Sequence, residues 1–161
     1  MIDLKKVLNY ISKQKKDIIN ISKLCKKNPD HITTRKYSDM KSYYTEKINK
    51  NPVLYKVYVK QGVLLNYGLT IINPGKIGNE YYFTKGHKHK NDSEELYYPI
   101  KGKGKLILQN NKRTIIKDLN KPIIVPKGYA HRTINTGRSK LEVMTVYSPK
   151  AGHDYSIKIK K

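Results

Sequence analysis

Apolar residues near the start of the chain recur at intervals of three and four positions. Between residues 3 and 27 the repeat consists of Leu4, Val7, Leu8, Ile11, Ile18, Ile21 and Leu24, separated largely by lysines. This spacing places apolar side chains on one face of a helix. It predicts one or two amphipathic helices, which end near Asn28 and Pro29 because proline disfavours a helical conformation in the residue before it.

The segment 29–52 has little apolar periodicity and is rich in polar and turn-forming residues. We expect it to be largely irregular, with a short helix near Asp39 to Ile48. Together with the preceding helices it forms a predicted N-terminal extension, residues 1–50, which packs on a domain formed by residues 51–161.

From Pro52 onward, short runs rich in β-branched and aromatic residues replace the helical pattern. The runs are 53–59, 63–72, 80–84, 95–100, 105–109, 113–117, 122–126, 132–136, 141–147 and 155–159. Turn-forming residues such as Asn73-Pro74-Gly75 and Asn110-Asn111 separate them. Short strands at intervals of about ten residues are typical of a sandwich or a barrel. The chain is therefore predicted to be mainly β, with a short N-terminal helical segment.

The length of 161 residues fits a single folded domain. No apolar run reaches about 18 residues, so we expect no membrane-spanning helix. The N-terminus also lacks the apolar core of a secretory signal. The chain has one cysteine, Cys25, which excludes an internal disulfide. These features predict a cytoplasmic protein.

The formal net charge of +22 raises the question of a nucleic-acid partner. The charge is spread evenly, since residues 1–50 contribute +8 and residues 51–161 contribute +14. Arginine, whose side chain reads bases, occurs only at Arg35, Arg113, Arg132 and Arg138. A solvated positive surface that attracts anionic small molecules explains the charge better than a nucleic-acid site does.

A pair of histidines in the β-rich region is the first candidate for chemistry. His87 and His89 are two positions apart, so on a strand their imidazoles point to the same face and can reach one metal ion. The alternative is a polar strand end with solvated histidines. The following Asn91-Asp92-Ser93 is predicted to form a hairpin turn, after which a carboxylate returns opposite the pair. Periodicity does not decide between Glu94 and Glu95 for that carboxylate.

A third histidine, His131, follows the turn Lys127-Gly128. Three imidazoles and one carboxylate form a ligand set that suits Fe²⁺, Mn²⁺, Ni²⁺, Co²⁺ or Zn²⁺ and leaves positions open for a substrate.

At these residues the chain resembles a known family. His87-x-His89, Glu95 and Gly102 resemble the first motif of the cupins, and Pro126-x-Gly128-x-x-His131-x-x-x-Asn135 resembles the second. The segments Asn73–His87, Ala130–Asn135 and Tyr147–Tyr155 are similar to the corresponding segments of the archaeal-type cupin glucose-6-phosphate isomerases. The resemblance implies a cupin jelly-roll barrel and a homodimer. It also implies the isomerisation of a phosphorylated hexose, glucose 6-phosphate to fructose 6-phosphate.

The resemblance also implies residue roles. It implies one divalent metal ion per chain, with Fe²⁺ as the first choice, held by His87, His89, Glu95 and His131, and it favours Glu95 over Glu94. The implied contacts to phosphate and sugar are Tyr55, Thr70, Thr84, Gly86, Tyr97, Tyr147, His153 and Tyr155. For the tyrosines the alternative is core packing, and for His153 it is a solvated turn. Glu95, His153 and Tyr155 are the candidate catalytic residues.

Two other functions compete with the isomerase. One is a cupin that binds a sugar or a metal without catalysis, and the other is a basic nucleic-acid-binding protein. For the isomerase itself, proton transfer by a base and a metal-assisted hydride shift remain open.

Overall fold

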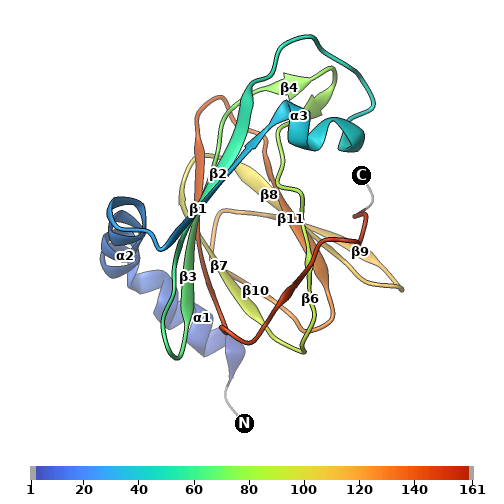
Figure 1. Cartoon of the computed structure of the whole chain (residues 1–161). Helices are drawn as coiled ribbons and strands as arrows, with labels where there is room; N and C mark the ends of the chain where they lie inside the picture. The colour runs from blue at the N-terminus through green and yellow to red at the C-terminus, as the bar shows by residue number, and fades with distance from the viewer. Residues whose placement is uncertain (1–2, 160–161) are drawn as a thin grey trace.

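The N-terminal part of the computed structural model, which describes residues 3–159, is helical (Figure 1). Helices α1 (Leu4–Lys13) and α2 (Lys15–Lys27) follow each other almost without interruption. Asp3 caps α1, because its carboxylate accepts a hydrogen bond of 2.9 Å from the Lys5 N–H. The prediction of one or two amphipathic helices that end near Asn28 and Pro29 is confirmed, with two helices of which the second ends at Lys27.

The rest of the described chain is dominated by antiparallel strands. The larger sheet has the order β1-β2-β3-β12-β7-β10 and contains the strands His31–Lys36, Val53–Lys60, Asn66–Ile72, Leu141–Tyr147, Glu95–Lys101 and Ile123–Val125. A second sheet has the order β11-β8-β9 and contains the strands Ala130–Asn135, Gly104–Gln109 and Thr114–Asp118. Two short pairs complete the set, β13 (His153–Asp154) with β6 (Lys88–His89) and β4 (Lys76–Ile77) with β5 (Glu80–Tyr81).

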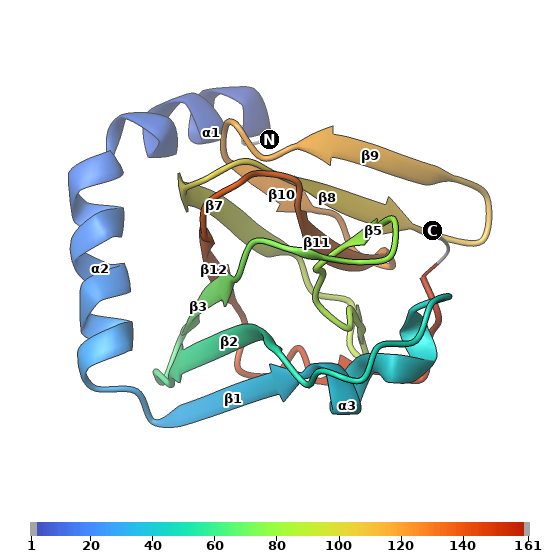
Figure 2. The same ribbon diagram turned by 90° about the horizontal axis from the view of Figure 1, so that it is seen from above.

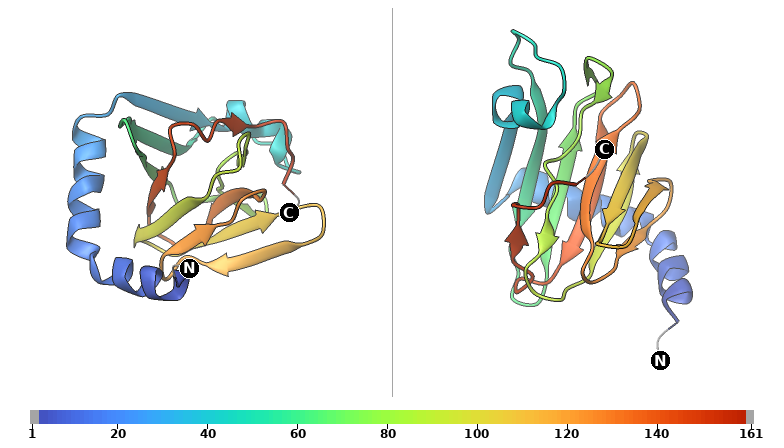
Figure 3. Two further views of the ribbon diagram at one scale, coloured as in Figure 1. Left: turned by 90° about the horizontal axis from the view of Figure 1, so that it is seen from below. Right: turned by 90° about the vertical axis from the view of Figure 1, so that its right-hand side faces the viewer.

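The two sheets face each other around a barrel. Seen from above, the larger sheet curves round so that β2 and β3 lie opposite β8 and β11 (Figure 2). The view from below shows the same ring, closed on one side by the C-terminal segment (Figure 3). Apolar side chains of both sheets fill part of the interior, among them Leu54, Ile72, Leu106, Leu108 and Val143. Burial of this interior surface is the main source of the barrel's stability.

The helices cover the outer face of the larger sheet. Ile18 and Ile21 of α2 pack against Leu69 of β3 and Met144 of β12. The hydroxyl of Tyr98 on β7 donates a hydrogen bond of 3.2 Å to the Ser12 carbonyl at the end of α1. The sheet therefore keeps its polar pocket on the inner face, while its outer apolar face is covered by the chain's own helices.

The structure corrects several expectations of local structure. The segment 29–52 contains a strand, β1, which pairs with β2 and joins the larger sheet. The short helix lies earlier than predicted, as α3 (Tyr37–Met40) and the 3-10 turn η1 (Lys41–Tyr43). The run 155–159 forms no strand, and the strand nearest to it is β13. Of the run 80–84, only the first two residues form a strand, β5.

The predicted hairpin between the histidine pair and Glu95 is also wrong. Strand β6 pairs with β13, whereas β7 pairs with β12 and β10. The polar segment Asn91–Glu94 therefore links two different sheets and is not a tight turn within one sheet. The division at residue 50 stays a prediction. Among residues 3–159, no helix has the length and apolarity needed to cross a membrane.

Candidate metal centre and substrate pocket

Four side chains meet inside the barrel. Three of them come from strands, and the fourth comes from a residue in an isolated β-bridge. His87 forms an isolated bridge with His131 on β11, through hydrogen bonds of 3.1 and 2.9 Å between their backbones. His89 lies on β6, and Glu95 is the first residue of β7. The candidate ligand atoms of these four residues all lie within 4.8 Å of one another. All four predicted ligands thus lie close together. They are brought together by strands of different sheets, and not by the predicted hairpin.

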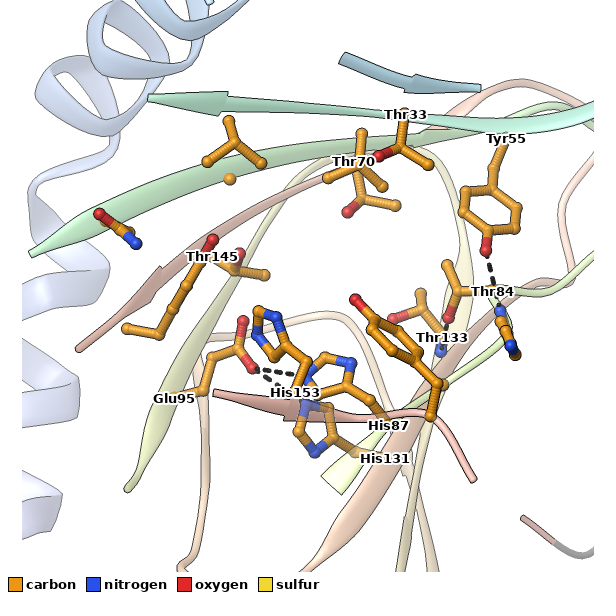
Figure 4. Close-up of a pocket in the computed structure, with 18 of the residues that line it drawn as sticks. Thr33, Tyr55, Thr70, Thr84, His87, Glu95, His131, Thr133, Thr145 and His153 are labelled. Carbon is orange, nitrogen blue, oxygen red and sulfur yellow. Dashed lines mark hydrogen bonds and ion pairs between the residues drawn. The ribbon is translucent and has the colours of Figure 1, made fainter. Parts of the chain in front are cut away.

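The Glu95 carboxylate is the centre of this group (Figure 4). Its Oε2 lies 2.9 Å from His131 Nε2, 3.2 Å from His89 Nε2 and 3.7 Å from His87 Nε2. The Glu95 side chain is 3% exposed. Its neighbour Glu94 is exposed and lies outside the group. Of Glu94 and Glu95, between which periodicity did not decide, Glu95 is the one that lies in this group.

The outer nitrogens of two imidazoles are fixed by backbone carbonyls. His89 Nδ1 lies 2.9 Å from the Ser93 carbonyl oxygen, and His131 Nδ1 lies 3.1 Å from that of Tyr129. A carbonyl oxygen only accepts hydrogen bonds, so each Nδ1 carries a proton and the lone pair of each neutral imidazole is on Nε2. These contacts orient both Nε2 atoms toward the centre, as in metal sites whose ligands are held by a second layer of hydrogen bonds.

The charges in the group fit a bound cation. Burial alone raises the pKa of Glu95, but the three imidazoles outweigh it and hold the pKa well below its usual range. Burial lowers the pKa of His87 to about 4, so its imidazole is neutral. His87 Nε2 is buried and has no hydrogen-bond partner. The neutral His87 offers a lone pair at Nε2 and no proton, and a divalent metal ion bound between these four ligand atoms would supply a positive charge that both this lone pair and the Glu95 carboxylate can share.

Aromatic and imidazole rings surround the group. His153 on β13 pairs with His89, and its ring centroid lies 4.3 Å from that of His87. The Tyr155 ring lies 5.6 Å from the His87 ring, and the Tyr97 ring lies 5.5 Å from the His131 ring. His153 is half-buried against the metal group and is not a solvated turn residue.

These rings, apart from that of His89, line a cavity of about 510 Å³. Every predicted contact to phosphate and sugar lines it, namely Tyr55, Thr70, Thr84, Gly86, Tyr97, Tyr147, His153 and Tyr155. Tyr55 and Tyr97 also belong to the apolar core. These two tyrosines therefore both pack in the core, which was the alternative, and line the pocket. The volume suits a small polar ligand.

The side of the pocket that lies away from Glu95 is rich in hydrogen-bonding groups (Figure 4). The Tyr55 hydroxyl accepts a hydrogen bond of 3.1 Å from the Lys85 N–H. The Thr84 hydroxyl oxygen accepts one of 3.0 Å from the Thr133 N–H, which leaves its own proton to donate. Between these segments and His87, Gly86 has a φ of +78°, in the left-handed region that favours glycine.

Sequence reasoning missed the contribution of β1 to this pocket. His31, Thr33 and Arg35 line it, but they lie in the segment that was expected to be irregular. Their spacing of two residues is the signal that could have identified them, because alternate residues of a strand share a face. The single apolar residue among them, Ile32, was too weak a pattern to predict a strand.

The chain is similar to known proteins in sequence and in fold. A family model described as glucose-6-phosphate isomerase matches residues 58–161. The glucose-6-phosphate isomerase of Thermococcus onnurineus is 42% identical over 142 residues, which cover 78% of this chain and 75% of the relative. That of Pyrococcus abyssi is 39% identical over 137 residues, covering 75% and 72%.

Two solved cupin structures support the fold alone. An oxalate decarboxylase from Lactobacillus farciminis aligns with a TM-score of 0.51 and 19% identity over 67% of this chain and 31% of its own. An oxalate oxidase aligns with a TM-score of 0.51 and 11% identity over 78% and 54%. The predicted cupin jelly roll is therefore confirmed. By its sequence, and with the two cupin motifs placed in one barrel, the chain belongs to the glucose-6-phosphate isomerase family.

Proposed function

We propose that the chain interconverts glucose 6-phosphate and fructose 6-phosphate, with one divalent metal ion held by His87, His89, Glu95 and His131. The observation that carries this proposal is the convergence of the four ligand atoms within 4.8 Å, at the wall of a pocket that suits a phosphorylated sugar. Its relatives are glucose-6-phosphate isomerases by name, which agrees with this chemistry. Fe²⁺ is our first choice among the divalent ions that an imidazole and carboxylate ligand set with open positions accepts.

The reaction moves one hydrogen between C1 and C2 of the sugar and one proton between O1 and O2. Bound at this site, the metal stabilises negative charge that develops on these two oxygens. The protein must supply a base for the carbon-bound hydrogen and a carrier for the hydroxyl proton. C1 and C2 must also be held close to the base and the proton carrier. The contacts to the phosphate end of the substrate fix this position.

Glu95 is our candidate for the base. One of its oxygens, Oε2, lies within 3.7 Å of an Nε2 atom of each of the three imidazoles, whereas Figure 4 shows the other oxygen pointing away from His87 and His131. Glu95 also lines the pocket, so this second oxygen is available to take the proton from one carbon and return it to the next. The low pKa of the Glu95 carboxylate keeps it ionised, which is the form that a general base requires.

His153 and Tyr155 are our candidates for moving the proton between O1 and O2. Both line the pocket, and their ring centroids lie 4.3 and 5.6 Å from that of His87. Burial lowers the pKa of His153, which favours a neutral imidazole that can accept a proton at one nitrogen and donate at the other.

A coupled assay with fructose 6-phosphate tests the proposal. The purified chain should form glucose 6-phosphate, lose this activity with a chelator, and regain it with Fe²⁺, Mn²⁺, Ni²⁺, Co²⁺ or Zn²⁺. A metal-loaded chain that turns over no hexose phosphate would contradict the proposal and leave a cupin that only binds sugar or metal. The homodimer stays a prediction, which light scattering on the same sample tests.

A further inference from the structure

The edge strand β1 contributes a charged side chain to the substrate pocket. Its alternate residues His31, Thr33 and Arg35 line the cavity. The register pairs Arg35 with Tyr55 on β2, so the two side chains lie next to each other on the inner face of the sheet. Arg35 is thereby placed on the side of the pocket that contains the Tyr55 hydroxyl and the Thr84–Gly86 segment.

The charge of Arg35 is not balanced by a carboxylate. Among residues 3–159, no acidic side chain forms an ion pair with it. The cavity lining contains one carboxylate, Glu95, and that group faces the three imidazoles. Arg35 is half-buried, and placing an unbalanced guanidinium in a pocket costs free energy unless the pocket receives an anion.

The second cation of the pocket is engaged differently. The Lys85 ammonium lies 5.4 Å from the centre of the Tyr155 ring and 5.9 Å from that of Tyr43, in the range of cation–π contacts. Arg35 interacts with the Tyr55 hydroxyl, which also accepts the Lys85 N–H. A guanidinium has five N–H donors in a planar fork, so this one contact leaves donors for a ligand.

Arg35 and the proposed metal ligands are placed so that the two ends of one substrate can contact them at the same time. The Tyr155 ring lies 5.4 Å from the Lys85 ammonium and 5.6 Å from the His87 ring, so it lies between the cationic side of the pocket and the metal ligands. A ligand that places an anionic group beside Arg35 can therefore extend along Tyr155 to the metal group.

We propose that Arg35 binds the phosphate group of the substrate through its guanidinium, next to the hydroxyls of Tyr55 and Thr84, and so selects hexose 6-phosphates over free hexoses. This inference rests on the proposed function, because it assigns the non-reacting end of the same substrate. The planar fork matches two phosphate oxygens at once, which a lysine cannot do.

Two variants and one control test this assignment by binding. Arg35→Gln removes the charge, Arg35→Lys keeps the charge without the fork, and Arg138→Gln makes the same charge change at an exposed loop. The probes are inorganic phosphate, sorbitol 6-phosphate and sorbitol, measured by calorimetry with metal-free and metal-loaded protein. Loss of a charge-assisted bidentate contact is expected to weaken binding about 10- to 100-fold.

We expect Arg35→Gln to raise the Kd of both phosphate-bearing probes by this factor and to leave that of sorbitol unchanged. Arg35→Lys should lie between Arg35→Gln and the wild type, and Arg138→Gln should bind like the wild type. With fructose 6-phosphate, KM should rise in Arg35→Gln more than kcat falls, because the contact lies away from the reacting carbons. Equal affinities of Arg35→Gln and the wild type for both phosphate-bearing probes would overturn the inference.

A measurement on the wild type keeps the test independent of how the variants fold. Phenylglyoxal modifies arginines, and mass spectrometry can follow each of the four. Inorganic phosphate should slow the modification of Arg35 and leave that of the exposed Arg113 and Arg138 unchanged. Equal rates at Arg35 with and without phosphate would overturn the inference. A wild type that shows this protection but no isomerase activity would contradict the proposed function and support the inference.

Discussion

Glu95 Oε2 lies 2.9 Å from His131 Nε2, although the two residues are 36 positions apart and belong to different sheets. This contact joins β7 of the larger sheet to β11 of the smaller one. It brings the two sequence motifs, each inconclusive alone, to one point inside the barrel. The proposed chemistry depends on this convergence of the two motifs.

Replacing Glu95 with Gln should weaken metal binding and slow the reaction. The amide keeps the shape of the side chain but loses the negative charge that a divalent cation requires. We expect metal affinity to fall at least about 10-fold, in the range seen for altered metal sites, and kcat to fall by more than about 10²-fold as the base is lost too. Metal analysis and the coupled assay measure both effects.

Glu94→Gln is the matched control for this variant. Glu94 precedes Glu95, carries the same charge and is exposed. The control should retain the metal content and kcat of the wild type. If Glu94→Gln and Glu95→Gln behaved alike, the assignment of the carboxylate ligand would be wrong.

Removal of the metal should destabilise the barrel as well as inactivate it. Without the cation, the buried Nε2 of His87 has no hydrogen-bond partner, and the buried Glu95 carboxylate has only imidazoles around its Oε2. A ligand that binds only the folded state stabilises it by about 2.7 kcal/mol when present at 100 times its Kd. We therefore expect Tm to rise on addition of metal to the metal-free chain, as measured by calorimetry. An unchanged Tm would argue against binding at this site.

Gly86→Ala should disturb the site more than the same change at Gly128. An added Cβ at Gly86 would lie 2.6 Å from Ile159 Cδ1 and 2.9 Å from the His131 carbonyl oxygen. At Gly128, where φ is +77°, nothing lies within 4 Å of the added atom. Both variants bear the backbone cost of about 1–2 kcal/mol for a left-handed alanine. Only Gly86→Ala should also lose kcat/KM, because its clash reaches the backbone of His131, a proposed metal ligand.

Thermal unfolding and the coupled assay separate these two effects. The difference between the two variants in free energy of unfolding reports the clash, since the backbone cost is common to both. Comparable kcat/KM values for Gly86→Ala and Gly128→Ala would show that this close packing does not control the site.

His153→Asn should slow catalysis without releasing the metal. His153 contacts the ring of His87 but lies outside the group of four ligand atoms. Loss of a proton carrier lowers rates by about 10²- to 10⁴-fold, so kcat should fall in this range while metal content stays at the wild-type level. A variant that loses its metal would instead make His153 a ligand or a support for one.

The reaction in D₂O tests the role of Glu95 as a base. Proton transfer through a carboxylate allows exchange with solvent, so glucose 6-phosphate formed from fructose 6-phosphate should carry deuterium at C2. NMR of the product measures this incorporation. Complete absence of deuterium at C2 would favour a hydride shift and remove the base role from Glu95.

The sequence predicted which side chains come together better than it predicted how the strands bring them together. The spacing of the cupin motifs identifies His87, His89 and His131. A motif specifies which side chains occur at which positions along the chain. The partner of each strand is a long-range property, and local turn residues such as Asn91-Asp92-Ser93 predicted a hairpin where the chain crosses between sheets. Tertiary pairing overrides the local signal here.

The same reasoning explains the missed strand β1. Its inner residues are polar because they line a pocket, and its outer residues are exposed because helix α2 covers other strands. Such a strand has no apolar face for a pattern to reveal. Its signal was therefore weakest at the positions that contribute Thr33 and Arg35 to the site.

The most direct test of the account is an anaerobic titration of the metal-free chain with Fe²⁺, in which bound metal and fructose 6-phosphate turnover are measured in the same samples. We predict that turnover rises in proportion to bound metal and stops rising at one equivalent per chain, and that Glu95→Gln binds Fe²⁺ more weakly and turns over more than about 10²-fold more slowly. Full turnover without metal, or one bound equivalent without turnover, would contradict the account.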